Sequence, residues 1–354
     1  MKILVVGDVH YSQYSSIIRR RGEFYSQRLE NLLWSVNWAE NKAKESSVDR
    51  VIYLGDFMDR ADINAEELTA FRDIRWAEDI PHFFLTGNHE AGLHSLQYSS
   101  IHFIESLGEN FKVIDKPTYD TGFGWRILFL PYIFEKERKS LSEYWKESQS
   151  SNMFETQEVK TSYIFSHNDL KGVNYGMFES EEGFDLKDIS SNCSYFINGH
   201  IHNSQWINSK TLNLGNLTGQ SFNEDATKYK HQILLIDTDT EKMELIENPY
   251  AYNFYKVEIA KESDLTKLKF KPHAIVSAKC KESLISKTRE LFENNQDIEE
   301  FKIITVLEDT DEVKECDESL KLTSTDYLDQ FKSYILEELG TSNNVVKELN
   351  EVIQ

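Results

Sequence analysis

Short apolar runs that end in polar residues recur along this chain and constrain its fold more than any other feature. The clearest run, residues 51–54, is followed directly by Gly55 and Asp56. Four apolar residues bounded by a turn signal are typical of a buried strand. Because helical patterns separate the first runs, the sequence predicts βαβ units and a mainly parallel sheet.

Helical periodicity fills the spaces between the first strands. Residues 25–45 carry their leucines and a valine on one stripe, which predicts an amphipathic helix. Asn64 followed by Glu67 is typical of a capping box and predicts a second helix, which we expect to reach residue 78. We expect strands at residues 2–6, 51–54, 83–85, 126–130, 163–165 and 195–197, and closing strands at 212–216 and 232–236.

Side chains that can hold a metal ion directly follow these strands. In open α/β sheets the ligand crevice lies outside the carboxyl ends of the strands, so residues far apart in sequence meet there. Of the ten histidines, five stand at strand ends, which a scatter of core or surface histidines would not produce. The residues expected to converge are Asp8, His10, Asp56, Asn88, His89, His167, His200 and His202.

The spacing of two motifs bears on the chemistry. Asp8 and His10 are two residues apart, so on an extended backbone their side chains leave on the same face. One carboxylate and one imidazole suit manganese, iron or zinc, whereas an isolated Asp-x-His also fits a strand followed by a turn. The two oxygens of Asp56 can bridge two ions about 3.5–4 Å apart, whereas an isolated Gly-Asp is also a plain turn signal.

The composition favours a soluble protein of more than one domain. At 354 residues the chain can bury a full core, and it has no apolar run of membrane length. Its first residues fit a strand better than a signal peptide. Cys193, Cys280 and Cys316 share no CxxC spacing, so neither a disulfide framework nor a zinc ribbon is indicated. We therefore expect no membrane contact and a reducing, cytoplasmic location.

The formal charge of −21 is unfavourable for binding nucleic acid through the general surface field. A DNA substrate would have to be held by local basic patches, by metal ions or by a partner chain. The triplet Arg19, Arg20 and Arg21 is a candidate patch for phosphates, with Tyr11 and Tyr14 as stacking faces. A solvated loop is the alternative interpretation of this segment.

The character of the chain changes after Pro249. Strands expected at residues 254–259, 274–278 and 301–307 and a helix at 282–294 predict a small α+β unit without ligand-type residues at its strand ends. An acidic stretch then predicts a solvated linker, followed by a helical tail. One face of this tail either packs on the chain's own core or binds a partner, and it carries Tyr327, Phe331, Tyr334 and Leu339. The expected domains are residues 1–250, 251–310 and 311–354.

Five motifs in order, each after a strand, resemble the calcineurin-like metallophosphoesterases over about residues 1–250. They are Asp-x-His, Gly-Asp, Gly-Asn-His-Glu, a single His, and Gly-His-x-His. Within that superfamily the chain looks most like the SbcD-type nuclease subunits of double-strand-break processing complexes, including phage members. The similar stretches are residues 166–172, 199–203 and 214–216, and the acidic residues 223–225 beyond them.

This resemblance implies a metallophosphoesterase sandwich of βαβ units with a small α+β capping domain and a helical C-terminal tail. It implies an exonuclease or endonuclease with two divalent ions, usually manganese, with iron or magnesium as alternatives. It also implies an SbcC-type coiled-coil ABC ATPase as partner, a homodimer within a heterotetramer, and the host cytoplasm for a phage-encoded chain. The site roles it implies are Asp8, His10 and His202 for one metal, Asn88, His167 and His200 for the other, Asp56 as the bridge, and His89 acting on the substrate.

Two departures from the SbcD pattern keep an alternative open. Glu90 stands where SbcD-type enzymes more often have aspartate. Residues 56–60, together with Gly-Asn-His-Glu, also look like protein serine/threonine phosphatases and dinucleoside polyphosphatases. Tyr11 stands where those families have glycine, and the pair His200 and His202 is the phosphodiesterase pattern. A protein phosphatase or another small-substrate phosphoesterase is therefore the alternative function.

Overall fold

The computed structural model describes residues 1–122, 124–150, 160–173 and 179–306. Residues 1–306 form one compact unit. The predicted tail face of Tyr327, Phe331, Tyr334 and Leu339 lies outside the described residues. In the described part, no helix is long and apolar enough to cross a membrane.

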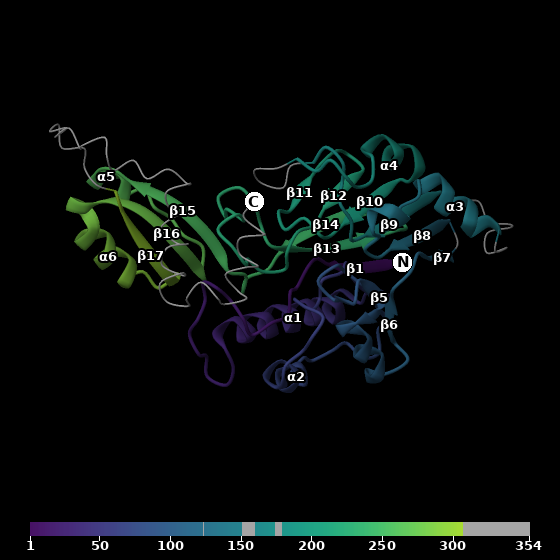
Figure 1. Cartoon of the computed structure of the whole chain (residues 1–354), viewed down its shortest axis with the longest axis horizontal. Helices are drawn as coiled ribbons and strands as arrows, with labels where there is room; N and C mark the ends of the chain where they lie inside the picture. The colour runs from purple at the N-terminus through teal and green to yellow at the C-terminus, as the bar shows by residue number, and fades with distance from the viewer. Residues whose placement is uncertain (123, 151–159, 174–178, 307–354) are drawn as a thin grey trace, which may run out of the picture. The chain divides into compact units, whose positions relative to one another are not determined.

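Two six-stranded sheets form the centre of the fold (Figure 1). In the first sheet the four strands β1, β2, β3 and β6 run parallel, while β13 pairs antiparallel with β1 and β14 pairs antiparallel with β13. This order agrees with the βαβ units expected from the sequence. In sheet order the strands are β14 (Lys242–Glu247), β13 (Gln232–Asp237), β1 (Lys2–Val6), β2 (Arg50–Tyr53), β3 (His82–Leu85) and β6 (Phe111–Ile114).

The second sheet is also parallel in its middle and antiparallel at its edges. Strands β12, β10, β9 and β8 pair in parallel, whereas β11 and β7 pair antiparallel with their neighbours. In sheet order the strands are β11 (Gln205–Trp206), β12 (Thr211–Asn213), β10 (Tyr195–Asn198), β9 (Thr161–Ser166), β8 (Trp125–Leu130) and β7 (Thr118–Gly122).

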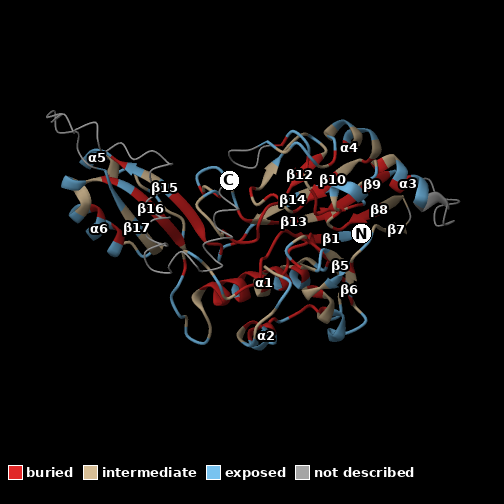
Figure 2. Cartoon of the chain, viewed as in Figure 1, coloured by how far each residue is buried: buried red, intermediate tan, exposed pale blue. Residues whose placement is uncertain are grey.

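The alternation of side chains along the strands builds a sandwich of the two sheets. In β1, Ile3 and Val5 pack with Phe165 of the other sheet, while Leu4 and Val6 pack on the opposite face. Helices α1 (Gln27–Ser46) and α2 (Ala65–Phe71) supply the cover of that outer face, and α3 (Leu141–Ser150) and α4 (Leu186–Asn192) cover the second sheet. Both faces of the central strands are therefore buried, as Figure 2 shows.

Helix α2 is shorter than the sequence pattern predicts. The capping box of Asn64 and Glu67 is present, but the helix ends at Phe71 rather than near residue 78. The chain leaves the helix because Trp76 is only 7% exposed and packs its ring 5.6 Å from that of Phe71. Tertiary burial of this aromatic side chain outweighs helical propensity. A hairpin of β4 (Ala91–Gly92) and β5 (Ser95–Ser99), which the sequence did not indicate, follows the Gly-Asn-His-Glu motif.

Three parallel strands form the small C-terminal sheet of the described chain. Their core is separate, and it includes Val276 and Phe292. The short helices lie between the strands, so the connections are those of an α/β unit rather than of segregated helices and strands. The boundary expected at residue 250 stays a prediction. The elements are β15 (Asn253–Ile259), α5 (Glu262–Leu265), β16 (Ala274–Lys281), η3 (Glu282–Leu284), α6 (Ile285–Glu293) and β17 (Ile298–Val306).

Candidate metal centre

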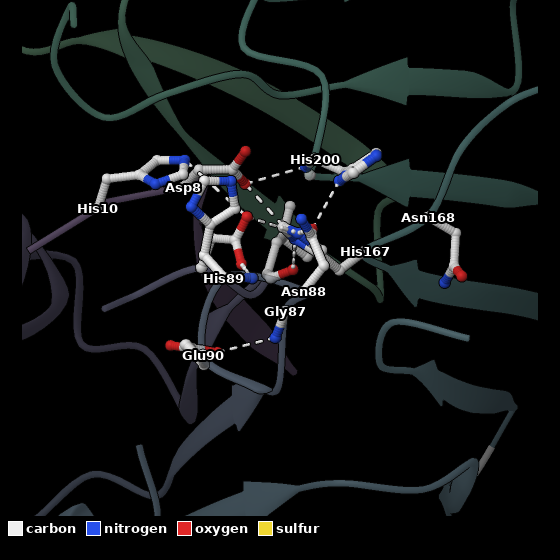
Figure 3. A network of polar contacts seen from close by, with 12 residues as sticks. Asp8, His10, Gly87, Asn88, His89, Glu90, His167, Asn168 and His200 are labelled. Atoms are coloured by element: carbon white, nitrogen blue, oxygen red, sulfur yellow. Dashed lines mark hydrogen bonds and ion pairs between the residues drawn. The ribbon is translucent and has the colours of Figure 1, made fainter. Parts of the chain in front are cut away.

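The side chains that follow β1, β2, β3, β9 and β10 converge at one place, as the sequence predicted (Figure 3). Asn88 joins the cluster through its Oδ1, which lies 3.2 Å from His167 Nε2 and 3.0 Å from His200 Nδ1. The other seven predicted residues fall into three groups whose candidate ligand atoms lie within 4.8 Å of one another. These groups are Asp8, His10 and His202; His10, Asp56 and His89; and Asp56, His167 and His200.

Asp56 lies between the other ligands. Its Oδ2 is 3.1 Å from His167 Nε2 and 3.9 Å from His10 Nε2, while its Oδ1 accepts a hydrogen bond of 2.9 Å from the backbone N–H of His89. Burial alone would raise the pKa of Asp56, but His167 and His10 outweigh it and hold that pKa well below its usual range. Asp56 is therefore a carboxylate at the position that a bridging ligand needs.

Two buried polar atoms in the cluster have no hydrogen-bond partner. They are Asp8 Oδ2 and His10 Nε2, in side chains 0% and 1% exposed. An unpaired buried acceptor loses its hydration without compensation, which costs on the order of 1–3 kcal/mol. A divalent cation compensates both atoms, and the carboxylate and imidazole donors suit manganese, iron or zinc. The residues present therefore fit a metal site.

Each histidine of the cluster is oriented by an oxygen that holds one ring nitrogen and leaves the other facing the centre. Such partners fix the tautomer and the ring direction of metal-ligating histidines. The pairs are His10 Nδ1 with Asp59 Oδ1 at 3.1 Å, His202 Nδ1 with Glu224 Oε1 at 3.3 Å, His200 Nε2 with Asp169 Oδ1 at 3.2 Å, and His167 Nδ1 with the carbonyl oxygen of Leu54 at 2.9 Å.

Three candidate ligands have a left-handed backbone. The φ angles are 49° at His10, 45° at Asp56 and 73° at His200. Non-glycine residues adopt this conformation at a cost of about 1–3 kcal/mol, and it concentrates at functional sites. The extended backbone expected between Asp8 and His10 is therefore wrong. The two side chains meet because the chain turns at His10.

The motif glycines allow the backbone to approach the carboxylates. A Cβ at Gly87 would lie 2.0 Å from Asp56 Oδ1, and a Cβ at Gly199 would lie 2.5 Å from Asp8 Oδ1. Both distances are far below van der Waals contact. These positions accept only glycine because the neighbouring N–H groups of His89 and His200 bind those same oxygens.

His89 stands at the mouth of the centre. It is exposed, and its Nδ1 donates to the carbonyl oxygen of Asp59 at 3.0 Å, so its Nε2 is left for another partner. Its ring centroid lies 4.7 Å from that of His10. The cleft in front of these residues has a volume of about 420 Å³. Its lining consists of Asp56, His89, Asp169, His200, Ile201, His202, Asn203, Ser221, Asn223 and Glu224.

Sequence reasoning missed the orienting carboxylates Asp59, Asp169 and Glu224. Asp59 and Asp169 follow candidate motifs closely, but spacing alone does not distinguish a partner of a histidine from a solvated acid. Glu224 lies 22 residues after its partner His202. Glu90 was noticed only as a departure from a family pattern. It is fully buried, and it accepts hydrogen bonds from the N–H groups of Gly87 at 2.8 Å and Met58 at 2.9 Å. Burial, and then the charge of Asp56, raise the pKa of Glu90 to about 8.

Two of the three arginines pair with carboxylates away from the metal centre, and among the described residues none of the three lines the cleft there. Arg20 pairs with Glu300 at 3.0 Å, and Arg21 pairs with Glu66 at 2.7 Å. Arg19 donates to the carbonyl oxygen of Ser16. The phosphate-binding role of Arg19, Arg20 and Arg21 stays a prediction, and these pairs would have to open for it.

The sequence model of the calcineurin-like phosphoesterases matches residues 1–204, which hold all five motifs. The chain belongs to this family. Its members are metal-dependent hydrolases acting on phosphoesters, and the centre described above holds residues of the kind that such an activity needs. The dimetal character of the family implies two divalent ions at the centre described above, and the identity of the metal stays a prediction.

Among the individual proteins that are similar to this chain, one is viral and one is from a fish. One is "Putative phosphoesterase 078R" of Invertebrate iridescent virus 3, with 22% identity over 213 residues, which cover 58% of this chain and 54% of the relative. The chain therefore spans about half the length of this curated relative. The other is the crystal structure of a dimetal phosphatase from Danio rerio, with a TM-score of 0.42 and 16% identity, covering 70% of this chain and 96% of that one.

Proposed function

We propose that this chain is a two-metal phosphodiesterase that cleaves DNA, as the nuclease subunit of an SbcD-type complex in recombination, repair or replication. The observation that carries the proposal is the position of the two histidines in Gly-His-x-His. His202 lies in the group with Asp8 and His10, whereas His200 lies in the group with Asp56 and His167. One short motif thus supplies a donor to each group, which is the phosphodiesterase pattern noted in the sequence.

The roles of the residues follow from their positions. Asp8, His10 and His202 would hold one ion, and Asn88, His167 and His200 the other. Asp56 would bridge them through Oδ2, which lies between His10 and His167. Two bound cations neutralise the charge of a phosphodiester and lower the pKa of an attacking water. Manganese is the proposed metal because it accepts this set of oxygen and nitrogen donors without thiolates.

His89 is the proposed substrate-binding and proton-donating group. With Nδ1 donating to Asp59, its Nε2 is available to a phosphoryl oxygen or to the leaving oxygen. Its exposure distinguishes it from His10 and His167, which are buried. Asp59 contacts both a proposed metal ligand and the proposed proton donor. Its carboxylate orients His10, and its carbonyl oxygen orients His89.

An SbcC-type coiled-coil ABC ATPase is the proposed partner, within a heterotetramer that contains two copies of this chain. The net charge of −21 supports the need for such a chain, because a long anionic polymer is repelled by this surface. The partner would supply the basic surface that holds DNA, while the ions at the centre supply local positive charge.

A comparison of substrates tests this function. The purified chain would be assayed with manganese on linear DNA, bis-p-nitrophenyl phosphate and a phosphoserine peptide. We expect cleavage of the two diesters and little release of phosphate from the peptide. A phosphopeptide that is by far the best substrate would instead establish the protein phosphatase alternative. The Asp56→Ala protein is the control for a contaminating nuclease, because it should cleave neither diester.

A further inference from the structure

A second groove, of about 630 Å³, lies beside the metal centre. Its volume is in the range of sites that hold small molecules. The β4–β5 hairpin, the residues between β6 and β7, the segment after β8 and helix α3 contribute its walls. Four aromatic side chains line it, which are Tyr119, Tyr132, Phe134 and Tyr144.

Tyr132 connects this groove to the catalytic cleft. Its ring centroid lies 5.9 Å from that of His200, which lines the cleft, and 5.3 Å from that of Phe134, which lies further along the groove. The backbone around it is fixed by the strand ends that carry the metal site. The N–H of Tyr132 donates to Thr86 at 2.9 Å, and the N–H of Ile133 donates to Asn168 Oδ1 at 2.9 Å.

The charges of the groove argue against a phosphate as its occupant. Lys139 is paired with Glu147 at 2.6 Å, and Lys116 belongs to the same lining as Asp115 and Glu137. With three acids and two lysines in its lining, the groove has no net positive charge to attract an anion. Aromatic faces without excess positive charge match a planar, uncharged group, and a nucleobase is such a group.

We propose that this groove is the subsite for the base of the nucleotide next to the scissile phosphate, with Tyr132 as its stacking face. The proposal rests on the proposed function, since it assigns to the same centre a nucleotide substrate. It explains why an aromatic residue stands two positions after the end of β8, where the backbone is fixed by hydrogen bonds to Thr86 and Asn168. Tyr132 would thus give the enzyme a preference for diesters that carry a base.

The test compares a short oligothymidylate with an abasic backbone of the same length, using the full chain and manganese. The wild-type protein should show a KM that is about 5- to 150-fold higher for the abasic backbone than for the oligothymidylate, which is the range that stacking on one aromatic ring provides. Tyr132→Ala should remove this difference by raising the KM of the oligothymidylate, whereas Tyr132→Phe should retain most of it. Trp34→Ala is the matched control, since Trp34 is 47% exposed on α1 and lines neither the groove nor the cleft.

Equal KM values for the two backbones in the wild-type protein would overturn the subsite but leave the nuclease function standing. A base preference that survives in Tyr132→Ala would likewise overturn the role of Tyr132. If neither backbone is cleaved while the phosphoserine peptide is, the proposed nuclease function fails, and the subsite fails with it. Circular dichroism of each variant separates loss of stacking from loss of the fold.

Discussion

The carboxylate and histidine ligands proposed for this centre use one polar atom to fix their own position and present a second one to the centre. Asp8 and Asp56 bind backbone N–H groups through Oδ1 and keep Oδ2 for the centre. The histidines do the same with their two ring nitrogens. The donor geometry is therefore set before any cation arrives, which reduces the reorganisation that binding would otherwise require.

The first consequence concerns Asp56. If its Oδ2 bridges two ions, Asp56→Ala should lower the bound metal from about two ions per chain to one or none and abolish turnover. Elemental analysis and hydrolysis of bis-p-nitrophenyl phosphate measure both. Asp62→Ala, in a side chain 90% exposed, is the control and should change neither. Two ions still bound to the Asp56→Ala protein would remove the bridging role.

The second consequence concerns His89. One of its ring nitrogens lies within 4.8 Å of a candidate ligand atom of His10 and of Asp56. As a substrate-binding proton donor it is dispensable for the metals, so His89→Ser should keep both ions and lower the hydrolysis rate by roughly 10²–10⁴-fold. Metal content and rate are measured on the same preparation. Loss of an ion would make His89 a ligand, and a near-normal rate with both ions would end its catalytic assignment.

Glu90 gives the metal-free protein a dependence of stability on pH. Its pKa rises from 4.5 to about 8 on folding, because of burial and then the charge of Asp56. Between these values the folded chain holds a proton that the unfolded chain has released, so stability must fall as the pH rises through this window. Above about pH 8 both states are ionised and this effect ends.

Thermal unfolding of chelator-treated protein between about pH 5 and pH 8 measures this dependence. In Glu90→Gln the side chain cannot ionise, so the melting temperature should fall less steeply with pH than in the wild-type protein. The variant loses one backbone hydrogen bond, since an amide nitrogen cannot accept from Gly87 or Met58, so its melting temperature should be lower throughout. Parallel slopes in the two proteins would show that Glu90 is ionised in the folded state.

The strand ends could be predicted from the sequence because a short apolar run followed by a polar turn is a local signal. Prediction from such local signals failed where contacts between residues distant in the sequence determine the structure. Helix α2 stops at Phe71 because Trp76 is drawn into the core, and no local signal reports that burial. The carboxylates that orient the histidines were missed for the same reason, since Glu224 is separated from its partner His202 by 22 residues.

Asn168 shows how neighbouring strand ends are joined. It is fully buried, and its amide donates to the carbonyl oxygens of Leu130 and Pro131 while its Oδ1 accepts from Ile133. Asn168→Ala would remove these bonds from the N–H of Ile133 and the carbonyl oxygen of Pro131, while the carbonyl oxygen of Leu130 keeps its bond from the N–H of His167. The free energy of unfolding should fall by about 2–3 kcal/mol.

Urea unfolding of Asn168→Ala measures that loss, and a variant at a surface asparagine, Asn294→Ala, is the control. Asn294 caps the end of α6 at an exposed position, and its side-chain amide donates to the carbonyl oxygen of Glu290. Asn294→Ala should change the free energy of unfolding by less than about 0.5 kcal/mol. If the two variants unfold alike, Asn168 does not hold the ends of β8 and β9 together.

In the molecule as a whole, an acidic surface surrounds a centre built for phosphoesters. Of the 354 residues, 60 are Asp or Glu and 39 are Lys or Arg, and arginines 20 and 21 are paired with glutamates. Two bound cations would neutralise the charge of the one phosphate at the centre, whereas the other phosphates of a DNA chain lie beyond their reach. For the proposed DNA substrate we therefore expect that processing of long DNA requires positive charge from a partner chain, which makes the position of a partner-binding segment important.

The C-terminal tail is the proposed partner-binding segment. Tyr327, Phe331, Tyr334 and Leu339 recur at one or two helical turns in the sequence, and an acidic stretch precedes them. Deleting residues 321–354 should leave the melting temperature almost unchanged and preserve manganese-dependent hydrolysis of a small diester. The truncated protein should no longer co-purify with an SbcC-type ATPase and should lose most processing of long DNA. A strongly destabilised protein that still binds the ATPase would instead show that this face belongs to the chain's own core.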